Sequence, residues 1–196
     1  NCRLSLTAMG QDVLPDNPYL NRLARSSASL VTISERSGDL LRESTGRGPD
    51  AVIPWGIDPP QGENPPWHDR QINILGVGSL IELKQWSLLL NTVEELAASK
   101  APHRAVMVGD GPLRPALQAE VHNRGLSDAV TFTGTLPRPQ VLRLMSQAQI
   151  LVHPARYEGQ GFVFCEALSR GMSIVSGPVG MAQPSPRWRV VEPAGF

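Results

Sequence analysis

The sequence predicts an α/β protein built on a doubly wound parallel sheet. Short apolar runs, which are typical of buried strands, alternate with stretches whose apolar residues recur at helical spacing. The connections between these elements are short, and glycines follow several of the strand-like runs. Because successive strand-helix units favour parallel pairing, this alternation predicts a Rossmann-like sheet with helices on both faces.

The first 55 residues hold the earliest part of this alternation. Residues 20–24 show helical spacing, and Ser34 is expected to cap a helix that runs to about Glu43, because its hydroxyl can accept a hydrogen bond from a free helical N–H. The strand-like runs are residues 2–7, 29–33 and 51–53. The chain begins at Asn1 and ends at Phe196, each close to a strand-like run, so we expect a fragment of a longer protein.

Residues 56–70 are the best candidate for a linker between domains. Prolines recur throughout this stretch, and Gly62, Glu63 and Asn64 lie between them, a composition that favours an extended connection. We therefore expect a first domain at residues 1–55, a proline-rich linker at 56–70 and a second domain at 71–196.

The second domain carries the most regular part of the pattern. The expected strands are residues 71–77, 105–108, 130–132, 150–152 and 174–175, with helices between them and a further strand-like run at 188–191. Ligands of doubly wound sheets bind beyond the carboxyl ends of the strands. Gly78, the turn 109–111, Gly134 and the Glu158 loop follow four of these strands, so we expect all four to converge on one crevice. We also expect Asp110 to cap the helix that follows it.

Two glutamates surround a glycine-rich turn between a strand-like run and a helical pattern. Residues 157–168 read YEGQGFVFCEAL, and Glu158 and Glu166 are eight positions apart. A helix that begins near Gly161 would offer free backbone N–H groups to an anion such as a diphosphate. Carboxylates repel that anion, so they are expected to bind hydroxyls of the same ligand, which indicates a nucleotide-sugar. The alternative is a carboxylate that stabilises the helix dipole and a solvated surface residue.

This segment resembles the acidic signature of the group 1 retaining glycosyltransferases, which have the two-domain GT-B fold. Segments 53–58, 153–154 and 171–175 also resemble parts of that family. The resemblance extends from about residue 6 to residue 180 and implies the end of an N-terminal, acceptor-side domain followed by most of the nucleotide-sugar-binding domain. Both domains would be truncated.

The resemblance also implies roles for individual residues. Glu158 would contact a hydroxyl of the donor sugar, and Glu166 would bind the ribose hydroxyls. Backbone groups would contact the rest of the donor, with those of Gly161, Phe162 and Val163 at the phosphates and those of Thr135 and Leu136 near the nucleobase.

The turn at Gly78 is followed by a departure from the family pattern. Members have an arginine and, five residues later, a lysine that clamp the diphosphate. Lys84 fills the second position, whereas Ser79 replaces the arginine and retains only a hydroxyl donor. A cation at the start of a helix is disfavoured by the helix dipole, so Lys84 indicates an anion nearby. We expect Glu158 and Lys84 to be catalytic, and the other named residues to bind the donor.

The implied reaction transfers a sugar from a UDP- or GDP-type donor to an acceptor hydroxyl with retention of configuration. The acceptor could be a glycan, a lipid-linked sugar or a small molecule, and we expect no metal ion or other cofactor. Because most of the first domain would be missing, the isolated fragment is expected to be inactive.

Three alternatives stay open. Met9 stands where many members of the family have histidine, and together with Ser79 it favours a non-catalytic nucleotide-sugar-binding subunit. A related GT-B sugar-nucleotide epimerase is a second alternative. An NAD-type dehydrogenase is disfavoured, because its glycine fingerprint would have a third glycine near Ile81.

The composition limits the partners and the location. Lys and Arg number 18, Asp and Glu also number 18, and the resulting zero net charge argues against a nucleic-acid partner. No apolar run reaches membrane-spanning length, and the two cysteines indicate a reducing compartment. We expect a cytoplasmic protein, and peripheral association with a membrane through the missing part stays open.

Overall fold

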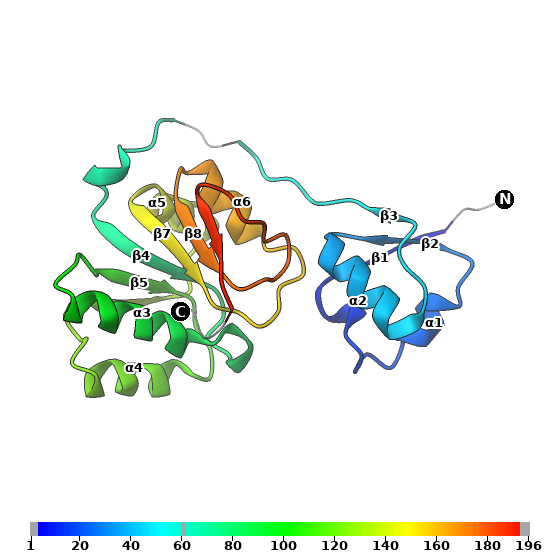
Figure 1. Ribbon diagram of the computed structural model, residues 1–196, viewed down its shortest axis with the longest axis horizontal. Helices are drawn as coiled ribbons and strands as arrows, with labels where there is room; N and C mark the ends of the chain where they lie inside the picture. The colour runs from blue at the N-terminus through cyan, green and yellow to red at the C-terminus, as the bar shows by residue number, and fades with distance from the viewer. Residues whose placement is uncertain (1–3, 60–61, 193–196) are drawn as a thin grey trace. The chain divides into compact units, whose positions relative to one another are not determined.

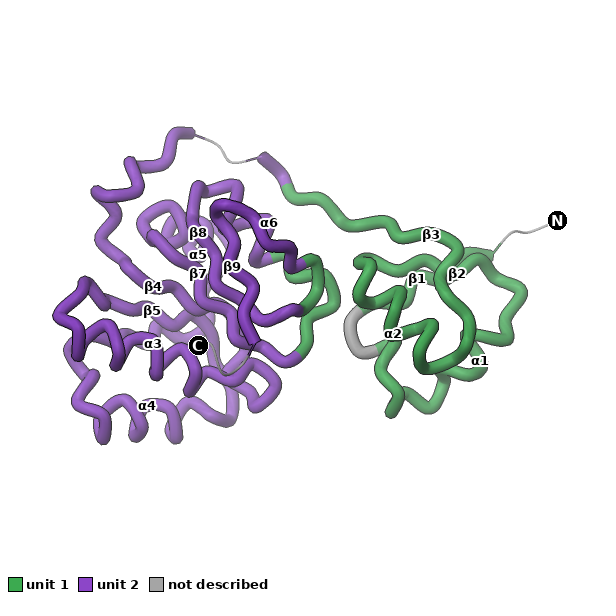
Figure 2. The backbone as a smooth tube through the Cα atoms, in the orientation of Figure 1, with its two compact units in different colours: residues 1–57, 157–162, 179–181 green, residues 58–156, 163–178, 182–196 purple. Residues whose placement is uncertain are grey.

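A computed structural model describes residues 4–59 and 62–192 (Figure 1). The chain forms two compact units, which are described separately (Figure 2). Unit 1 consists of residues 1–57, 157–162 and 179–181, and unit 2 consists of residues 58–156, 163–178 and 182–196.

Unit 1 contains a small parallel sheet with strand order β1-β2-β3. The strands are β1 (Ser5–Ala8), β2 (Ser29–Thr32) and β3 (Ala51–Val52), and the helices are η1 (Gly10–Val13), α1 (Leu20–Ala24) and α2 (Glu35–Thr45). Leu30 and Leu41, each 1% exposed or less, pack in the core of this unit. The strand-like runs of the first 55 residues are therefore confirmed, except at residues 2 and 3, which lie outside the described residues.

Helix α2 begins as its sequence predicts. The Ser34 side chain is the N-cap and accepts a hydrogen bond from the Ser37 N–H at 3.1 Å. The helix ends at Thr45, two residues beyond the predicted end, where Gly46 adopts a φ of 74° and donates to the Arg42 carbonyl at 2.8 Å. A left-handed glycine after the last turn is a common helix terminator, because glycine lacks the Cβ that makes this conformation costly.

Unit 2 is built on a six-stranded sheet with order β6-β5-β4-β7-β8-β9, and every adjacent pair is parallel. Its strands are β4 (Ile72–Val77), β5 (Ala105–Val108), β6 (Val130–Gly134), β7 (Ala148–His153), β8 (Ser173–Ser176) and β9 (Trp188–Val190). Its helices are η2 (Trp67–Asp69), η3 (Glu82–Lys84), α3 (Trp86–Ala98), α4 (Arg114–Asn123), α5 (Arg138–Ser146) and α6 (Phe162–Ser169), whose first residue belongs to unit 1. The predicted doubly wound α/β fold is confirmed.

The strand order explains how helices cover both faces of this sheet. The chain runs outward from β4 to β6 and then crosses back to β7, so right-handed connections place α3 and α4 on one face and α5 and α6 on the other (Figure 1). Trp86, Leu89, Leu90 and Val93, each 2% exposed or less, form the buried side of α3. Their spacing is the helical pattern visible in the sequence.

A buried arginine attaches the end of the predicted linker to unit 2. Arg70 is 7% exposed, and its guanidinium donates to the carbonyls of Pro65, Ala148 and Arg170 at 3.2, 2.8 and 2.8 Å. Because three separate segments share one side chain, the end of the linker is fixed against the sheet. Residues 60 and 61 of the linker lie outside the described residues, and the division into 1–55, 56–70 and 71–196 stays a prediction.

Candidate functional site

Three glycine turns lie side by side at the carboxyl ends of β4, β5 and β6. The Gly78 N–H donates to the Val108 carbonyl at 2.9 Å, and the Gly109 N–H donates to the Gly134 carbonyl at 2.9 Å. These three turns lie together as expected, whereas the Glu158 loop belongs to unit 1, so its convergence with them on one crevice stays a prediction. The order of the sheet places this row beside β7, in the region where doubly wound folds bind their ligands.

The first two turns approach so closely that side chains cannot fit between them. A Cβ added to Gly109 would lie 1.9 Å from the Gly78 carbonyl oxygen, and one added to Gly111 would lie 2.5 Å from that of Leu80. Gly109 also has a φ of 138°, which few other residues adopt. The edge of the sheet therefore presents backbone rather than side chains.

Asp110 does not cap the following helix, so that prediction is wrong. Helix α4 begins at Arg114 with Leu113 at the N-cap and no side-chain cap. The Asp110 carboxylate instead accepts hydrogen bonds from the Gly111 N–H at 2.8 Å and from Arg114 at 2.7 Å. These bonds, the Gly111 contact first, lower the pKa of Asp110 below its usual value. The Asp110 carboxylate therefore stabilises the turn at residues 109–111 and not the N-terminus of α4, where Leu113 is the N-cap.

Ser79 and Lys84 lie in the loop between β4 and α3. The buried Trp86 donates from its indole Nε1 to the Ser79 carbonyl at 2.9 Å, while the Ser79 side chain is exposed. Lys84 ends η3 two residues before α3, and a Cβ on Gly78 would lie 3.7 Å from the Lys84 Cε. The lysine side chain thus runs back over the glycine turn, as a diphosphate clamp would require.

Glu166 is joined to the segment that follows β6. Its carboxylate accepts a hydrogen bond from the Arg138 Nε at 2.8 Å, with the Glu166 side chain 13% exposed and that of Arg138 55% exposed. This hydrogen bond raises the pKa of Arg138. Because Arg138 begins α5 two residues after Leu136, the structure brings Glu166 close to the predicted nucleobase segment of Thr135 and Leu136.

Arg138 is a candidate residue that the sequence analysis missed. The sequence did offer a reason to select it, because Arg138 is a cation in the first turn of a helix. Such a placement is unfavourable for the helix dipole, and the same argument was applied to Lys84. Its partner Glu166 lies 28 residues further along the chain, so the ion pair itself could not be recognised from local spacing.

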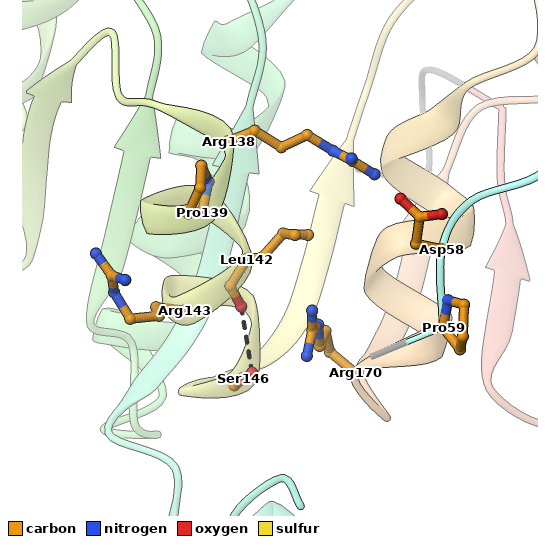
Figure 3. A pocket seen from close by; sticks show the side chains of 8 residues that line it. All are labelled: Asp58, Pro59, Arg138, Pro139, Leu142, Arg143, Ser146 and Arg170. Atoms are coloured by element: carbon orange, nitrogen blue, oxygen red, sulfur yellow. Dashed lines mark hydrogen bonds between the residues drawn. The ribbon is translucent and has the colours of Figure 1, made fainter. Parts of the chain in front are cut away.

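A pocket of about 430 Å³ lies beside this ion pair in unit 2 (Figure 3). Arg138 points toward Asp58 at one side of the pocket, and Arg143 and Arg170 supply two more cations. Its lining residues are Asp58, Pro59, Arg138, Pro139, Leu142, Arg143, Ser146 and Arg170. None of the site residues expected from the sequence is among these, so the predicted donor residues lie elsewhere among the described residues.

The remaining predicted residues lie on the loop 157–162 and at the start of α6. Glu158 is partly buried, Gly161 has a φ of 85°, and α6 begins at Phe162, so the predicted helix start is confirmed. Glu158, Gly161 and Phe162 belong to unit 1, whereas Val163 and all other predicted site residues belong to unit 2. Within unit 2 the structure brings together Gly78, Ser79 and Lys84, and the roles of all predicted site residues stay predictions.

Met9 lies in the short turn between β1 and η1. Its N–H donates to the Asp12 carboxylate at 2.9 Å, and its side chain is exposed. Asp12 therefore shapes the turn, whereas Met9 supplies no titratable group in place of the histidine that many members of the family have.

Metal ligands and membrane-spanning helices can be examined only within residues 4–59 and 62–192. In those residues no group of three or more His, Cys, Asp or Glu side chains is arranged to hold a metal ion, and metal independence stays a prediction. Across the same residues, every helix is too short or too polar to traverse a bilayer.

The parallel sheet and its row of backbone turns define a Rossmann-like α/β protein. The family of glycosyl transferases group 1 matches residues 61–184, which is more than half of the chain. The chain therefore belongs to that family.

One curated relative and two solved structures illustrate the similarity, the structures through their fold alone. The 2-deoxystreptamine glucosyltransferase of Streptomyces kanamyceticus is 28% identical over 170 residues, which are 80% of this chain and 44% of the relative. The pneumococcal O-GlcNAc transferase GtfA, solved with UDP and GlcNAc, has a TM-score of 0.78 at 15% identity and covers 97% of this chain and 41% of its own. Anabaena Alr3699/HepE, solved with UDP and glucose, has a TM-score of 0.77 at 19% identity, and the match covers 97% of this chain and 58% of the HepE chain. The chain thus spans less than half of the length of the curated relative and of GtfA, and 58% of that of Alr3699/HepE.

Proposed function

We propose that the full-length protein is a retaining glycosyltransferase that transfers a sugar from a nucleotide-sugar to an acceptor hydroxyl. The observation that carries this proposal is the family match over residues 61–184, a range that contains the three joined glycine turns, Lys84 and Glu166. The sugar-nucleotide epimerase alternative has no comparable support from the structure.

The proposed chemistry depends on stabilising the leaving diphosphate. Lys84 supplies a positive charge beside the Gly78 turn, and the Ser79 hydroxyl can donate one hydrogen bond. Backbone N–H groups of Gly161, Phe162 and Val163 at the start of α6 would add the partial positive charge of a helix terminus. Together these groups can replace a metal ion in neutralising the charge that develops on the diphosphate.

The two glutamates would bind hydroxyls at opposite parts of the donor. Glu158 is proposed to contact the transferred sugar, and Glu166 the ribose, while the backbone of Thr135 and Leu136 lies near the base. The Arg138 guanidinium orients the Glu166 carboxylate, because its Nε donates a charge-assisted hydrogen bond to it. Neither glutamate is proposed to transfer a proton.

We favour UDP over GDP as the nucleotide of the donor. The neighbours from pneumococcus and Anabaena were both solved with UDP, and the sugar in those structures differs. We also propose a cytoplasmic location for the protein and expect the 196-residue chain alone to bind nucleotide without turnover.

Nucleotide titrations of Glu166→Ala test this function. The full-length variant should bind UDP about 1–3 kcal/mol more weakly than the wild type, because hydrogen bonds from ribose hydroxyls to a charged group are lost. Glu95→Ala, at an exposed position of α3, is the matched control. Isothermal titration with UDP, GDP and ADP would measure the change, and unchanged affinity in a folded Glu166→Ala protein would remove this residue from the site.

A non-catalytic nucleotide-sugar-binding subunit is the second candidate function, favoured by Ser79 and Met9. The full-length wild type would then bind UDP-sugars and never release UDP, with or without candidate acceptors. Ser79→Arg should raise UDP affinity by restoring the clamp of the family, and the double variant Ser79→Arg, Met9→His tests whether turnover returns. Release of UDP by the wild type would exclude the non-catalytic alternative.

A further inference from the structure

The carbonyl of Gly159 is buried against the N-terminus of α2 within unit 1. It accepts hydrogen bonds from the Ser34 Oγ at 2.6 Å and from the Ser37 Oγ at 3.2 Å. Both serines are at most 3% exposed. Because a buried carbonyl costs free energy unless it is paired, these two hydroxyls determine where the backbone after Glu158 can lie.

The side-chain amide of Gln160, the next residue, forms two hydrogen bonds with the backbone of Trp55. Its Nε2 donates to the Trp55 carbonyl at 2.6 Å, and its Oε1 accepts from the Trp55 N–H at 2.8 Å. The side chain thereby pairs with Trp55 as a neighbouring strand would. Gln160 is 2% exposed, so its amide would lose both partners at a buried position if these hydrogen bonds were broken.

The backbone of Gln160 is held from a third direction. Its carbonyl accepts from the Met181 N–H at 3.0 Å. A Cβ on Gly180 would lie 2.4 Å from that carbonyl oxygen and 3.4 Å from the Glu158 Cβ. The loop is therefore fixed at residues 159 and 160 by contacts from residues 34, 37, 55, 180 and 181.

We propose that Gln160 is a positioning residue that sets the orientation of Glu158 toward the donor sugar. Its amide pair with Trp55 and the two serine contacts to Gly159 fix the peptide groups directly after Glu158, which restricts the directions its carboxylate can take. This inference rests on the proposed function, because it requires Glu158 to bind the transferred sugar. It adds that sugar binding depends on residues more than 100 positions earlier in the chain.

The inference predicts a selective loss. Only the sugar part of the donor would contact Glu158, so a variant that frees the loop should weaken binding of UDP-glucose more than binding of UDP, which can lose only its contacts to the neighbouring backbone of Gly161 and Phe162. A residue with a purely structural role would weaken the binding of both ligands equally, or of neither. The ratio of the two affinities is therefore the decisive measurement.

The test uses Gln160→Met in the full-length protein, because methionine has a similar length and forms neither hydrogen bond. Gln118→Met, exposed on α4, is the matched control. We expect the affinity for UDP-glucose relative to that for UDP to fall about tenfold in Gln160→Met alone. Amide hydrogen exchange of residues 157–162 should also become faster, which reports on the loop independently of any ligand.

A second pair of variants keeps the inference falsifiable should Gln160→Met fail to fold. Ser37→Ala removes one of the two hydroxyl donors to Gly159, and Ser44→Ala on the same helix is its control. The expected result is the same selective loss, smaller in size because Ser34 still donates. An unchanged ratio with faster exchange, or equal weakening of UDP and UDP-glucose, would overturn the inference. A wild type that binds neither ligand would overturn the proposed function itself, and this is seen before any variant is made.

Discussion

Glu158 and Glu166 belong to one motif and carry the same charge, yet they are held by different means. The backbone after Glu158 is fixed by buried hydrogen bonds from two serines, by part-buried hydrogen bonds between Gln160 and Trp55, and by the main chain of Met181. Glu166 is fixed through its own carboxylate by Arg138, a side chain that is 55% exposed. The serine contacts to Gly159 are buried between uncharged groups, whereas the ion pair of Glu166 has an exposed partner.

This difference indicates how each residue should respond to its surroundings. Hydrogen bonds between buried groups are insensitive to salt, but an ion pair with an exposed partner is screened by it. The orientation of Glu158 should therefore depend on the fold of unit 1, and that of Glu166 on ionic strength. The following variants test this contrast.

Gly180→Ala should have the largest effect, because it places a Cβ 2.4 Å from the Gln160 carbonyl oxygen at a φ of 58°. We expect a loss of at least about 2 kcal/mol in unfolding free energy. Gly46→Ala is the control, because its φ of 74° is equally unfavourable while nothing lies within 4 Å of the added Cβ. It should lose about 1 kcal/mol. Equal losses in urea unfolding would show that the loop tolerates displacement.

Ser34→Ala should cost about 1–2 kcal/mol of unfolding free energy, because the serine is both the N-cap of α2 and a donor to the Gly159 carbonyl. Ser37→Ala, which leaves the cap intact, should cost less. The comparison is made by chemical denaturation of both variants, and the two losses should not change with added salt. A marked salt dependence would contradict the proposed difference between the two glutamates.

Arg138→Gln should change unfolding free energy by less than about 1 kcal/mol, because exposed ion pairs contribute little. Its effect should appear in UDP affinity, which we expect to fall severalfold as Glu166 loses its orientation. Added salt should weaken UDP binding less in the variant than in the wild type. Arg143→Gln on the same helix is the control, and equal behaviour of the two variants would assign no specific role to the Arg138 pair.

The smallest predicted effect is a change of stability with pH that arises from Tyr157, and it should be visible only at high pH. Burial raises the pKa of Tyr157 above its ordinary value of about 10. A group with a raised folded-state pKa stabilises the protein below its unfolded pKa, so this contribution is complete at neutral pH and is lost as pH rises through the folded pKa. Ultraviolet titration of the phenolate, with Tyr157→Phe subtracted, measures the midpoint. A midpoint below 10 would contradict the buried setting of the loop.

The sequence predicts well what depends on neighbours along the chain. Ser34 as a cap, the buried side of α3 and the helix start at Phe162 follow from local spacing and are confirmed. Asp110 shows the limit, because its carboxylate could serve either a helix or its own turn, and only the packing of that turn against residues 78–80 decides between them.

The contacts that hold the two glutamates could not be predicted in the same way. Gln160 lies 105 residues from Trp55, and Arg138 lies 28 residues from Glu166, so neither pair follows a helical or strand period. Such pairs are set by the closing of the fold. The sequence shows which residues carry chemistry, whereas the structure shows which residues keep them in place.

The close approach of Gly109 to Gly78 has a consequence for protein engineering. Any side chain at residue 109 would occupy the volume of a neighbouring peptide group, so this position cannot be diversified without rebuilding the loop. Libraries intended to change nucleotide preference should leave the glycine turns untouched and randomise the exposed Thr135 and the partly buried Leu136. Because both side chains are at least partly open to solvent, substitutions there meet less steric restriction than at residue 109.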